Sequence, residues 1–119
     1  MNSVCVLGAG SYGTALAFCL SRNGIKTVLW GRDQHQIKLM ELSRGNQKYL
    51  PNAILPKKLS LESDLSKAIA GSQDILVVVP SHAFSGTLQE AKPFLTSEHR
   101  IIWATKGLEP ETGRLLQDV

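Results

Sequence analysis

Short apolar runs alternate along the chain with segments whose apolar residues recur at helical spacing. The apolar runs predict five strands, at residues 4–7, 27–30, 59–61, 74–80 and 100–104. The segments between them predict four helices, which end near residues 22, 44, 70 and 95. Residues 46–58 contain two prolines and predict an irregular loop. Because strands and helices alternate, the pattern predicts an α/β fold with a parallel sheet and right-handed crossovers.

Polar residues and glycines mark the predicted helix boundaries. The first helix is expected to begin at Thr14, directly after a glycine-rich loop. Side-chain oxygens that cap free N–H groups are expected from Asp33 for the second helix, Ser63 or Asp64 for the third, and Ser81 for the fourth. The glycines at 45 and 71 are expected to end the second and third helices.

The loop after the first strand reads Gly8-Ala9-Gly10-Ser11-Tyr12-Gly13. A G-x-G-x-x-G loop between a strand and a helix is the fingerprint of dinucleotide binding in a Rossmann-type fold. Gly8 would make the tight turn, Gly10 would let a pyrophosphate approach the backbone, and Gly13 would let the helix pack closely. The helix N-terminus would attract the phosphates, with further contacts from Ser11 and Tyr12. The alternative is a glycine-rich turn with a structural role alone.

This fold predicts the strand order 3-2-1-4-5, with a ligand crevice at the carboxyl ends of strands one and four. The end of the second strand then bears on cofactor choice. NAD-selective sites usually carry an acid there, whereas this chain has Gly31 followed by Arg32. Arg32 therefore favours NADP, or use of both cofactors, by pairing with a 2′-phosphate or stacking on adenine. Asp33 could be the missing acid, but a helix cap explains it more simply.

Three further residues are expected on the ligand side of the sheet. Lys106 follows the fifth strand and would meet a cofactor or substrate phosphate, or else lie in solvent as a loop lysine. Phe84 would belong to the core or form a wall of the nicotinamide pocket. His82 has no visible partner, so a structural role is favoured over acid–base chemistry. The sequence contains neither a metal-ligand constellation nor a nucleophile–base pair.

Composition narrows the class of protein. The 119 residues are 43% hydrophobic and 19% charged, which is typical of one globular domain. The net charge is +3 and the 13 basic residues are scattered, so a nucleic-acid partner is not expected. No apolar run approaches membrane-spanning length and no signal peptide is evident. Cys5 and Cys19 lie in apolar segments and are expected to be reduced core residues of a cytoplasmic protein.

The end of the chain predicts a fragment of a longer protein. Residues 113–119 resemble the opening of an amphipathic helix, and no capping residue or polar tail closes it.

Beyond these patterns, the chain resembles the N-terminal cofactor-binding domain of the bacterial NAD(P)-dependent glycerol-3-phosphate dehydrogenases. The resemblance runs in order along essentially the whole chain. The turn Thr105-Lys106-Gly107-Leu108-Glu109 is more specific than the glycine loop, which related reductases share. The matching stretches are residues 8–17, 29–32, 46 with 49–51, 78–82 with 84, and 105–109.

The resemblance implies an enzyme that interconverts dihydroxyacetone phosphate and sn-glycerol 3-phosphate, which feeds phospholipid synthesis. By this analogy Ser11, Tyr12 and Arg32 contact the cofactor, Phe84 lies near it, and Lys106 contacts both cofactor and substrate. The catalytic lysine of the family lies in a helical second domain, so no catalytic residue is expected here and Lys106 would only support the oxyanion. The fragment alone should bind nucleotide weakly and should not turn over. The sequence leaves the oligomeric state open, a homodimer included.

Two other readings of the sequence remain. Ketopantoate reductase, pyrroline-carboxylate reductase and 6-phosphogluconate dehydrogenase share this nucleotide domain, but the Lys106 turn and the Trp30-Gly31-Arg32 strand end favour the first family. A non-catalytic nucleotide-sensing domain is the alternative from a different class, because fold alone does not determine function.

Overall fold

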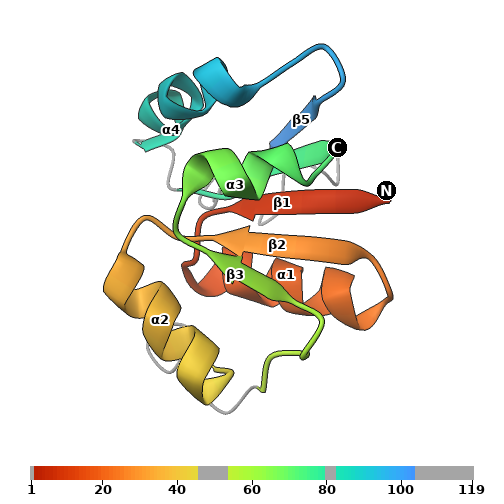
Figure 1. The fold of residues 1–119 in the computed structure, drawn as a ribbon, viewed down its shortest axis with the longest axis vertical. Helices are drawn as coiled ribbons and strands as arrows, with labels where there is room; N and C mark the ends of the chain where they lie inside the picture. Colours follow the sequence, from red (N-terminus) through yellow and green to blue (C-terminus); the bar gives the residue numbers. More distant parts are fainter. Residues whose placement is uncertain (1, 46–53, 80–82, 104–119) are drawn as a thin grey trace, which may run out of the picture.

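A computed structural model describes residues 2–45, 54–79 and 83–103 of the chain. They form a five-stranded parallel sheet with the strand order β3-β2-β1-β4-β5 (Figure 1). The strands are β1 (Ser3–Leu7), β2 (Lys26–Trp30), β3 (Ser60–Glu62), β4 (Asp74–Val77) and β5 (Arg100–Trp103). The predicted α/β class and strand order are therefore confirmed.

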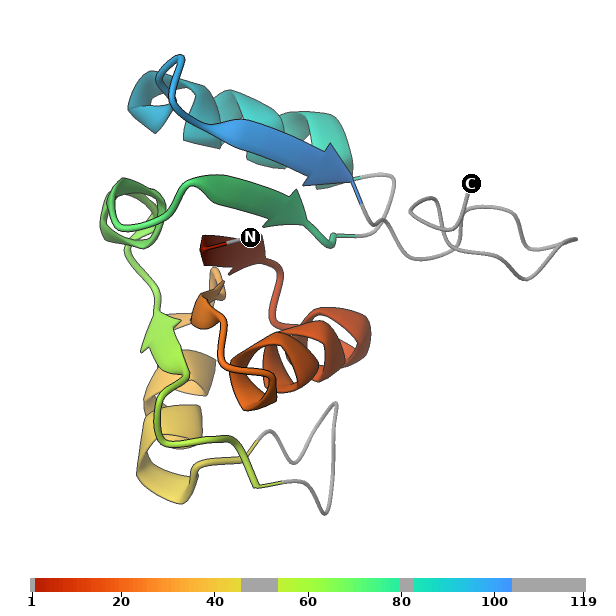
Figure 2. The same ribbon diagram turned by 90° about the vertical axis from the view of Figure 1, so that its right-hand side faces the viewer.

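Helices cover both faces of this sheet, as Figure 2 shows for α1 and α3. The helices are α1 (Ser11–Arg22), α2 (Gln34–Ser43), α3 (Leu65–Ala70) and α4 (Phe84–Ala91), which continues into the 3-10 turn η2 (Lys92–Phe94). Residues of α1 and α2 pack with one face of the sheet, and residues of α3 and α4 pack with the other. The sheet is therefore the middle layer of three.

The central strand β1 explains why its sequence is apolar without alternation. Val4 and Val6 belong to the core on the α1 and α2 side, whereas Cys5 and Leu7 belong to the core on the α3 and α4 side. All four side chains are fully buried. A parallel strand covered on both faces needs apolar residues at every position.

Two of the predicted helix caps are present. The Asp33 carboxylate accepts hydrogen bonds from the backbone N–H groups of His35 and Gln36 at the start of α2. Asp64, rather than Ser63, caps α3 in the same way. The predicted cap Ser81 lies outside the described residues.

The end of α2 differs by one position from the expectation. Arg44, rather than Gly45, adopts the left-handed conformation, with φ of 54°. Its backbone carbonyl accepts a hydrogen bond from Leu55 N, and its guanidinium donates to the carbonyls of Pro56 and Leu59. These bonds fasten the following loop to α2 and offset the cost of a positive φ.

Three other expectations are wrong in detail. The helix α1 begins at Ser11 instead of Thr14, so the last part of the glycine motif forms its first turn. The strand β4 ends at Val77, and Val78 and Val79 follow it outside the strand. Cys19 is exposed, because α1 buries the opposite helix face through residues such as Ala17.

Cys5 does lie in the core, and burial raises the pKa of its thiol to about 12. The Cys5 thiol is therefore protonated and unreactive at neutral pH. No helix among the described residues is long and apolar enough to cross a membrane.

Candidate nucleotide-binding site

A cleft of about 370 Å³ opens at the carboxyl ends of β1, β2 and β4. This is the edge where an open parallel sheet binds its ligands. The glycine loop forms its floor, the end of β2 one wall, and the start of α4 the other. The lining residues include Gly8, Ala9, Gly10, Ser11, Tyr12, Gly13, Trp30, Gly31, Arg32, Gln36, Val78, Ala83 and Thr87.

Two glycines of the loop are required by the fold itself. Gly8 has φ of +125°, and a Cβ atom there would lie 2.2 Å from the carbonyl oxygen of Val78. A Cβ atom on Gly13 would lie 1.8 Å from the carbonyl oxygen of Gly8. Gly8 therefore makes the turn and Gly13 lets α1 pack against it, as the sequence predicts.

Gly10 differs from both of these glycines. No atom of the described residues lies within 4 Å of the position that its Cβ would take. Its φ of −76° and ψ of −169° describe extended backbone that any residue adopts. The described residues therefore give no packing reason for glycine at this position, and Gly10 lines the cleft.

The first turn of α1 offers a place for an anion. Gly10 is its N-cap residue and supplies no side-chain hydrogen bond to the helix. The first turn contains no acidic residue. A helix N-terminus of this kind attracts phosphate through its N–H groups and its dipole.

Side chains from two helices hold the loop in place. The carbonyl oxygen of Ala9 accepts hydrogen bonds from Thr14 Oγ1 at 3.3 Å and from Gln36 Nε2 at 3.1 Å. The backbone N–H of Gly8 donates to the carbonyl of Trp30 at 2.9 Å. The sequence reasoning missed Gln36, although its place in the first turn of α2, three residues after the Asp33 cap, could have suggested it.

Gly31, which follows β2, is closely packed between α2 and the glycine loop. A Cβ atom on Gly31 would lie 2.9 Å from Ile37 Cδ1 and 3.0 Å from Ala9 Cβ. A larger residue would therefore require the Ile37 side chain to shift and would press against Ala9. Asp33 caps α2 through its Oδ1 atom, as predicted, and it also lines the cleft.

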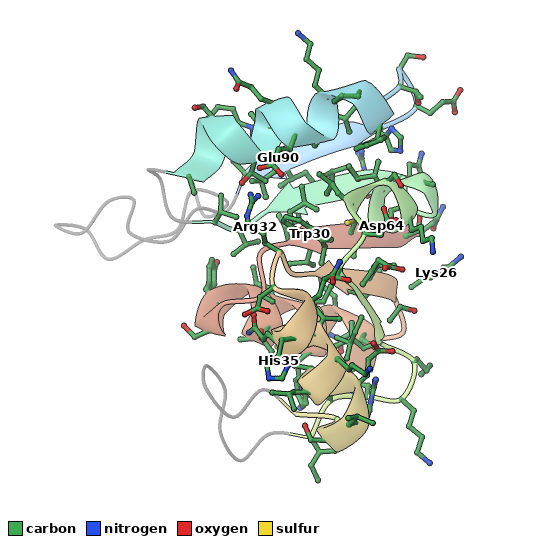
Figure 3. All side chains as sticks on the ribbon, turned by 60° about the vertical axis from the view of Figure 1, so that its left-hand side comes forward. Lys26, Trp30, Arg32, His35, Asp64 and Glu90 are labelled. Atoms are coloured by element: carbon green, nitrogen blue, oxygen red, sulfur yellow. The ribbon has the colours of Figure 1, made fainter. Side chains whose placement is uncertain are left out.

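Arg32 reaches across the mouth of the cleft (Figure 3). Its Nη1 lies 2.7 Å from Oε1 and 2.9 Å from Oε2 of Glu90 on α4. Its guanidinium carbon lies 5.5 Å from the centroid of the Trp30 ring. The sequence reasoning found Arg32 but missed Glu90.

Thr87 contributes a buried hydroxyl on the α4 side of the cleft. The residue is 1% exposed, and its Oγ1 has no hydrogen-bond partner among the described residues.

Six of the predicted site residues are brought together in this one cleft. They are Gly8, Gly10, Ser11, Tyr12, Gly13 and Arg32. Phe84 begins α4 beside the cleft, but its side chain is outside the description. Lys106 and His82 lie outside the described residues. Within the described part of the chain, no three His, Cys, Asp or Glu residues gather as a metal site.

The strand order, the glycine loop and the helix N-terminus that begins at Gly10 define a Rossmann-type nucleotide-binding domain. The family is shown by a sequence match over residues 3–119 to the model described as "NAD-dependent glycerol-3-phosphate dehydrogenase N-terminus". This chain belongs to that family.

Individual relatives agree with this assignment. The chain is 59% identical over 116 residues to a glycerol-3-phosphate dehydrogenase [NAD(P)+] of Colwellia psychrerythraea, covering 98% of this chain and 35% of the relative. A glycerol-3-phosphate dehydrogenase [NAD(P)+] of Shewanella frigidimarina is 60% identical over 116 residues, which cover 98% of this chain and 34% of the relative. The chain therefore spans about a third of the length of these curated relatives.

Solved structures show the same fold. The glycerol-3-phosphate dehydrogenase of Coxiella burnetii superposes with a TM-score of 0.84 at 40% identity, over 93% of this chain and 34% of that one. A ketopantoate reductase of Ralstonia eutropha superposes with a TM-score of 0.72 at 23% identity, over 88% of this chain and 34% of that one. The second likeness concerns the fold alone.

Proposed function

We propose that this chain is the nucleotide-binding domain of an enzyme that interconverts dihydroxyacetone phosphate and sn-glycerol 3-phosphate with NAD(P)H. The product would supply phospholipid synthesis. The observation that carries the proposal is the cleft above the glycine loop, with open space beside Gly10, in a chain of this family. A helical substrate domain elsewhere in the protein would complete the enzyme. This accords with the relatives, because the chain covers only 35% of the length of one of them.

The residues of the cleft fit a dinucleotide. The pyrophosphate would lie beside Gly10 and against the N-terminus of α1, near Ser11 and Tyr12. The adenosine half would extend towards Arg32 at the end of β2. The nicotinamide half would lie towards the start of α4, where Phe84 is our proposed neighbour.

The chemistry would be divided between this domain and the rest of the protein. When bound, a reduced nicotinamide supplies a hydride to the ketone carbon of the substrate. The role of this chain is to bind and orient the cofactor through its glycine loop. We further propose that Lys106 contacts cofactor and substrate and stabilises the developing oxyanion, while a lysine of the substrate domain provides the proton.

The cellular setting follows from the same proposal. The substrate is a small phosphorylated molecule, and the enzyme would work in the cytoplasm. Two free cysteines, one of them exposed, accord with a reducing compartment. Assembly as a homodimer stays a prediction.

The proposal is tested by assaying the full-length protein that contains this chain. We expect oxidation of NADH or NADPH that depends on dihydroxyacetone phosphate. Ketopantoate, pyrroline-5-carboxylate and 6-phosphogluconate, each with the matching cofactor form, should give no comparable rate. Nucleotide binding without turnover on any of these substrates would favour a nucleotide sensor instead. Residues 1–119 alone should bind nucleotide weakly and show no turnover.

A further inference from the structure

The ion pair between Arg32 and Glu90 joins two walls of the cleft that are 58 residues apart in sequence. Both oxygens of the Glu90 carboxylate lie within hydrogen-bond distance of Arg32 Nη1. Figure 3 shows the Arg32 side chain extending from the end of β2 to the underside of α4, with Trp30 beside it.

Glu90 lies on α4 and pairs with Arg32, which lines the cleft. Ala83 and Thr87 line the cleft, and Glu90 follows them at helical spacing, so all three lie along one face of the helix. The position of Arg32 is set from below by Trp30, whose indole Nε1 donates to the carbonyl of Ser63 at 3.1 Å. The guanidinium is therefore held between a fixed ring and a carboxylate.

The carboxylate of Glu90 lies near the position expected for the ribose 2′-group, which is a phosphate in NADPH and a hydroxyl in NADH. The ribose 2′-position of a bound cofactor lies at the carboxyl end of β2, beside Arg32. A 2′-phosphate needs the guanidinium as its counter-ion, and here Glu90 already holds that group. A 2′-hydroxyl carries no charge, so NADH binds without breaking the ion pair.

We propose that Glu90 is a specificity-determining residue that lowers the preference for NADPH by competing with the 2′-phosphate for Arg32. This inference rests on the proposed function, because it requires a dinucleotide in the cleft. In effect α4 supplies a negative charge beside the end of β2, where the chain has Gly31 and Arg32.

The test is a titration of NADH and NADPH into the full-length protein with four variants. Glu90→Gln removes the competing charge and keeps the shape of the side chain. Glu98→Gln is the matched control, because it makes the same change of charge on an exposed residue next to β5 at the opposite, amino-terminal edge of the sheet. Arg32→Gln and the double variant Arg32→Gln/Glu90→Gln complete a double-mutant cycle.

We expect Glu90→Gln to raise the affinity for NADPH relative to NADH by about three- to fivefold, as suits one exposed ion pair. Glu98→Gln should leave the ratio unchanged, and Glu90→Gln should have no effect on the ratio once Arg32 is absent. An unchanged ratio in Glu90→Gln would overturn the inference. An equal change in both Arg32 backgrounds would also overturn it, since Glu90 would then act without Arg32. If the wild type bound neither nucleotide, the proposed function itself would fail.

Discussion

The two edges of the sheet each carry an arginine–carboxylate pair, but the two pairs lie in very different surroundings. At the amino edge, Arg100 Nε and Nη2 lie 2.7 and 3.1 Å from the two oxygens of Asp74. The Asp74 side chain is fully buried, whereas the Arg100 side chain is 67% exposed. At the carboxyl edge, the Arg32 and Glu90 side chains are 60% and 47% exposed.

The difference favours a structural role for the pair at the amino edge and accords with our proposal that the pair at the carboxyl edge acts in ligand choice. Asp74 and Arg100 are the first residues of β4 and β5 and are partners in the strand register, so their pair fixes how these strands align. The Arg32–Glu90 pair joins a strand end to a helix at the rim of the cleft. Exposed pairs add little stability, so this one is free to serve ligand choice.

The largest effect is expected at the glycine loop. Gly13→Ala should lower the free energy of unfolding by about 1–3 kcal/mol, because its Cβ would overlap the carbonyl oxygen of Gly8. Nucleotide affinity should fall by about tenfold or more, equivalent to about 1.4 kcal/mol. Denaturant unfolding and nucleotide titration measure the two quantities.

Gly86→Ala is the matched control, since Gly86 is an exposed glycine in α4 with no described atom within 4 Å of its Cβ position. It should be neutral or slightly stabilising, by up to about 1 kcal/mol. Equal effects of the two substitutions would contradict the close packing at Gly13.

The next largest effect is a difference in how much the two ion pairs contribute to thermal stability. Arg100→Met removes the partner of the buried Asp74 carboxylate and should lower the melting temperature clearly. Arg32→Met should change the melting temperature little, because both members of its pair are exposed. Thermal unfolding of both variants at neutral pH is the measurement, and a larger drop for Arg32→Met would reverse the assignment of the two edges.

Acid should abolish the contribution of the amino-edge pair. Hydrogen bonds from Arg100 hold the pKa of Asp74 below its ordinary value of 3.8. A carboxyl whose pKa is lower in the folded state stabilises the fold above its unfolded pKa, and that stabilisation is lost as the pH falls through the folded pKa.

Wild type should therefore be more stable than Asp74→Asn at pH 7, and the difference should shrink below pH 3.8. Unfolding curves of both proteins at a series of pH values test this. If the stability difference between the two proteins increased as the pH fell, the result would contradict this prediction.

A smaller effect is expected from the hydrogen bond that holds the loop from α2. Gln36→Leu removes the donor to the Ala9 carbonyl and should weaken nucleotide binding by about fivefold, close to the 1 kcal/mol of one hydrogen bond. Gln34→Leu is the control, because Gln34 is an exposed residue of the same helix turn. Equal nucleotide affinities of the two variants would show that Gln36 does not support the glycine loop in binding.

The sequence predicted the sheet well because β1 and most of β2, β4 and β5 are apolar runs and the glycine motif identifies the first crossover. It predicted the start of α1 three residues late, since Ser11, Tyr12 and Gly13 show no apolar periodicity although they are helical. Cys19 looked like a core residue because its neighbours are apolar, whereas only the packed helix shows which side is buried.

Within the site, the sequence predicted the residues that belong to a contiguous motif and missed those that meet only on folding. Gln36 contacts a carbonyl 27 residues earlier in the chain, and Glu90 pairs with an arginine 58 residues away. Such contacts depend on the strand order and helix placement, which spacing along the chain does not show. The close packing around Gly31 was missed for the same reason, because its contacts are Ala9 in the glycine loop and Ile37 in α2.

The most direct test of the nucleotide site is a titration of NADH and NADPH into the full-length protein and its Gly10→Val variant. The backbone at Gly10 suits any residue, and its Cβ position meets no described atom within 4 Å beyond its chain neighbours, so the variant should fold with a loss of about 1 kcal/mol at the helix N-cap. Valine is a poorer N-cap than glycine, so denaturant unfolding must show that the variant is folded under the conditions of the titration. Its side chain would fill the space assigned to the pyrophosphate. The account predicts that the wild type binds the nucleotides and that the stably folded variant does not. Equal binding by both proteins would contradict it.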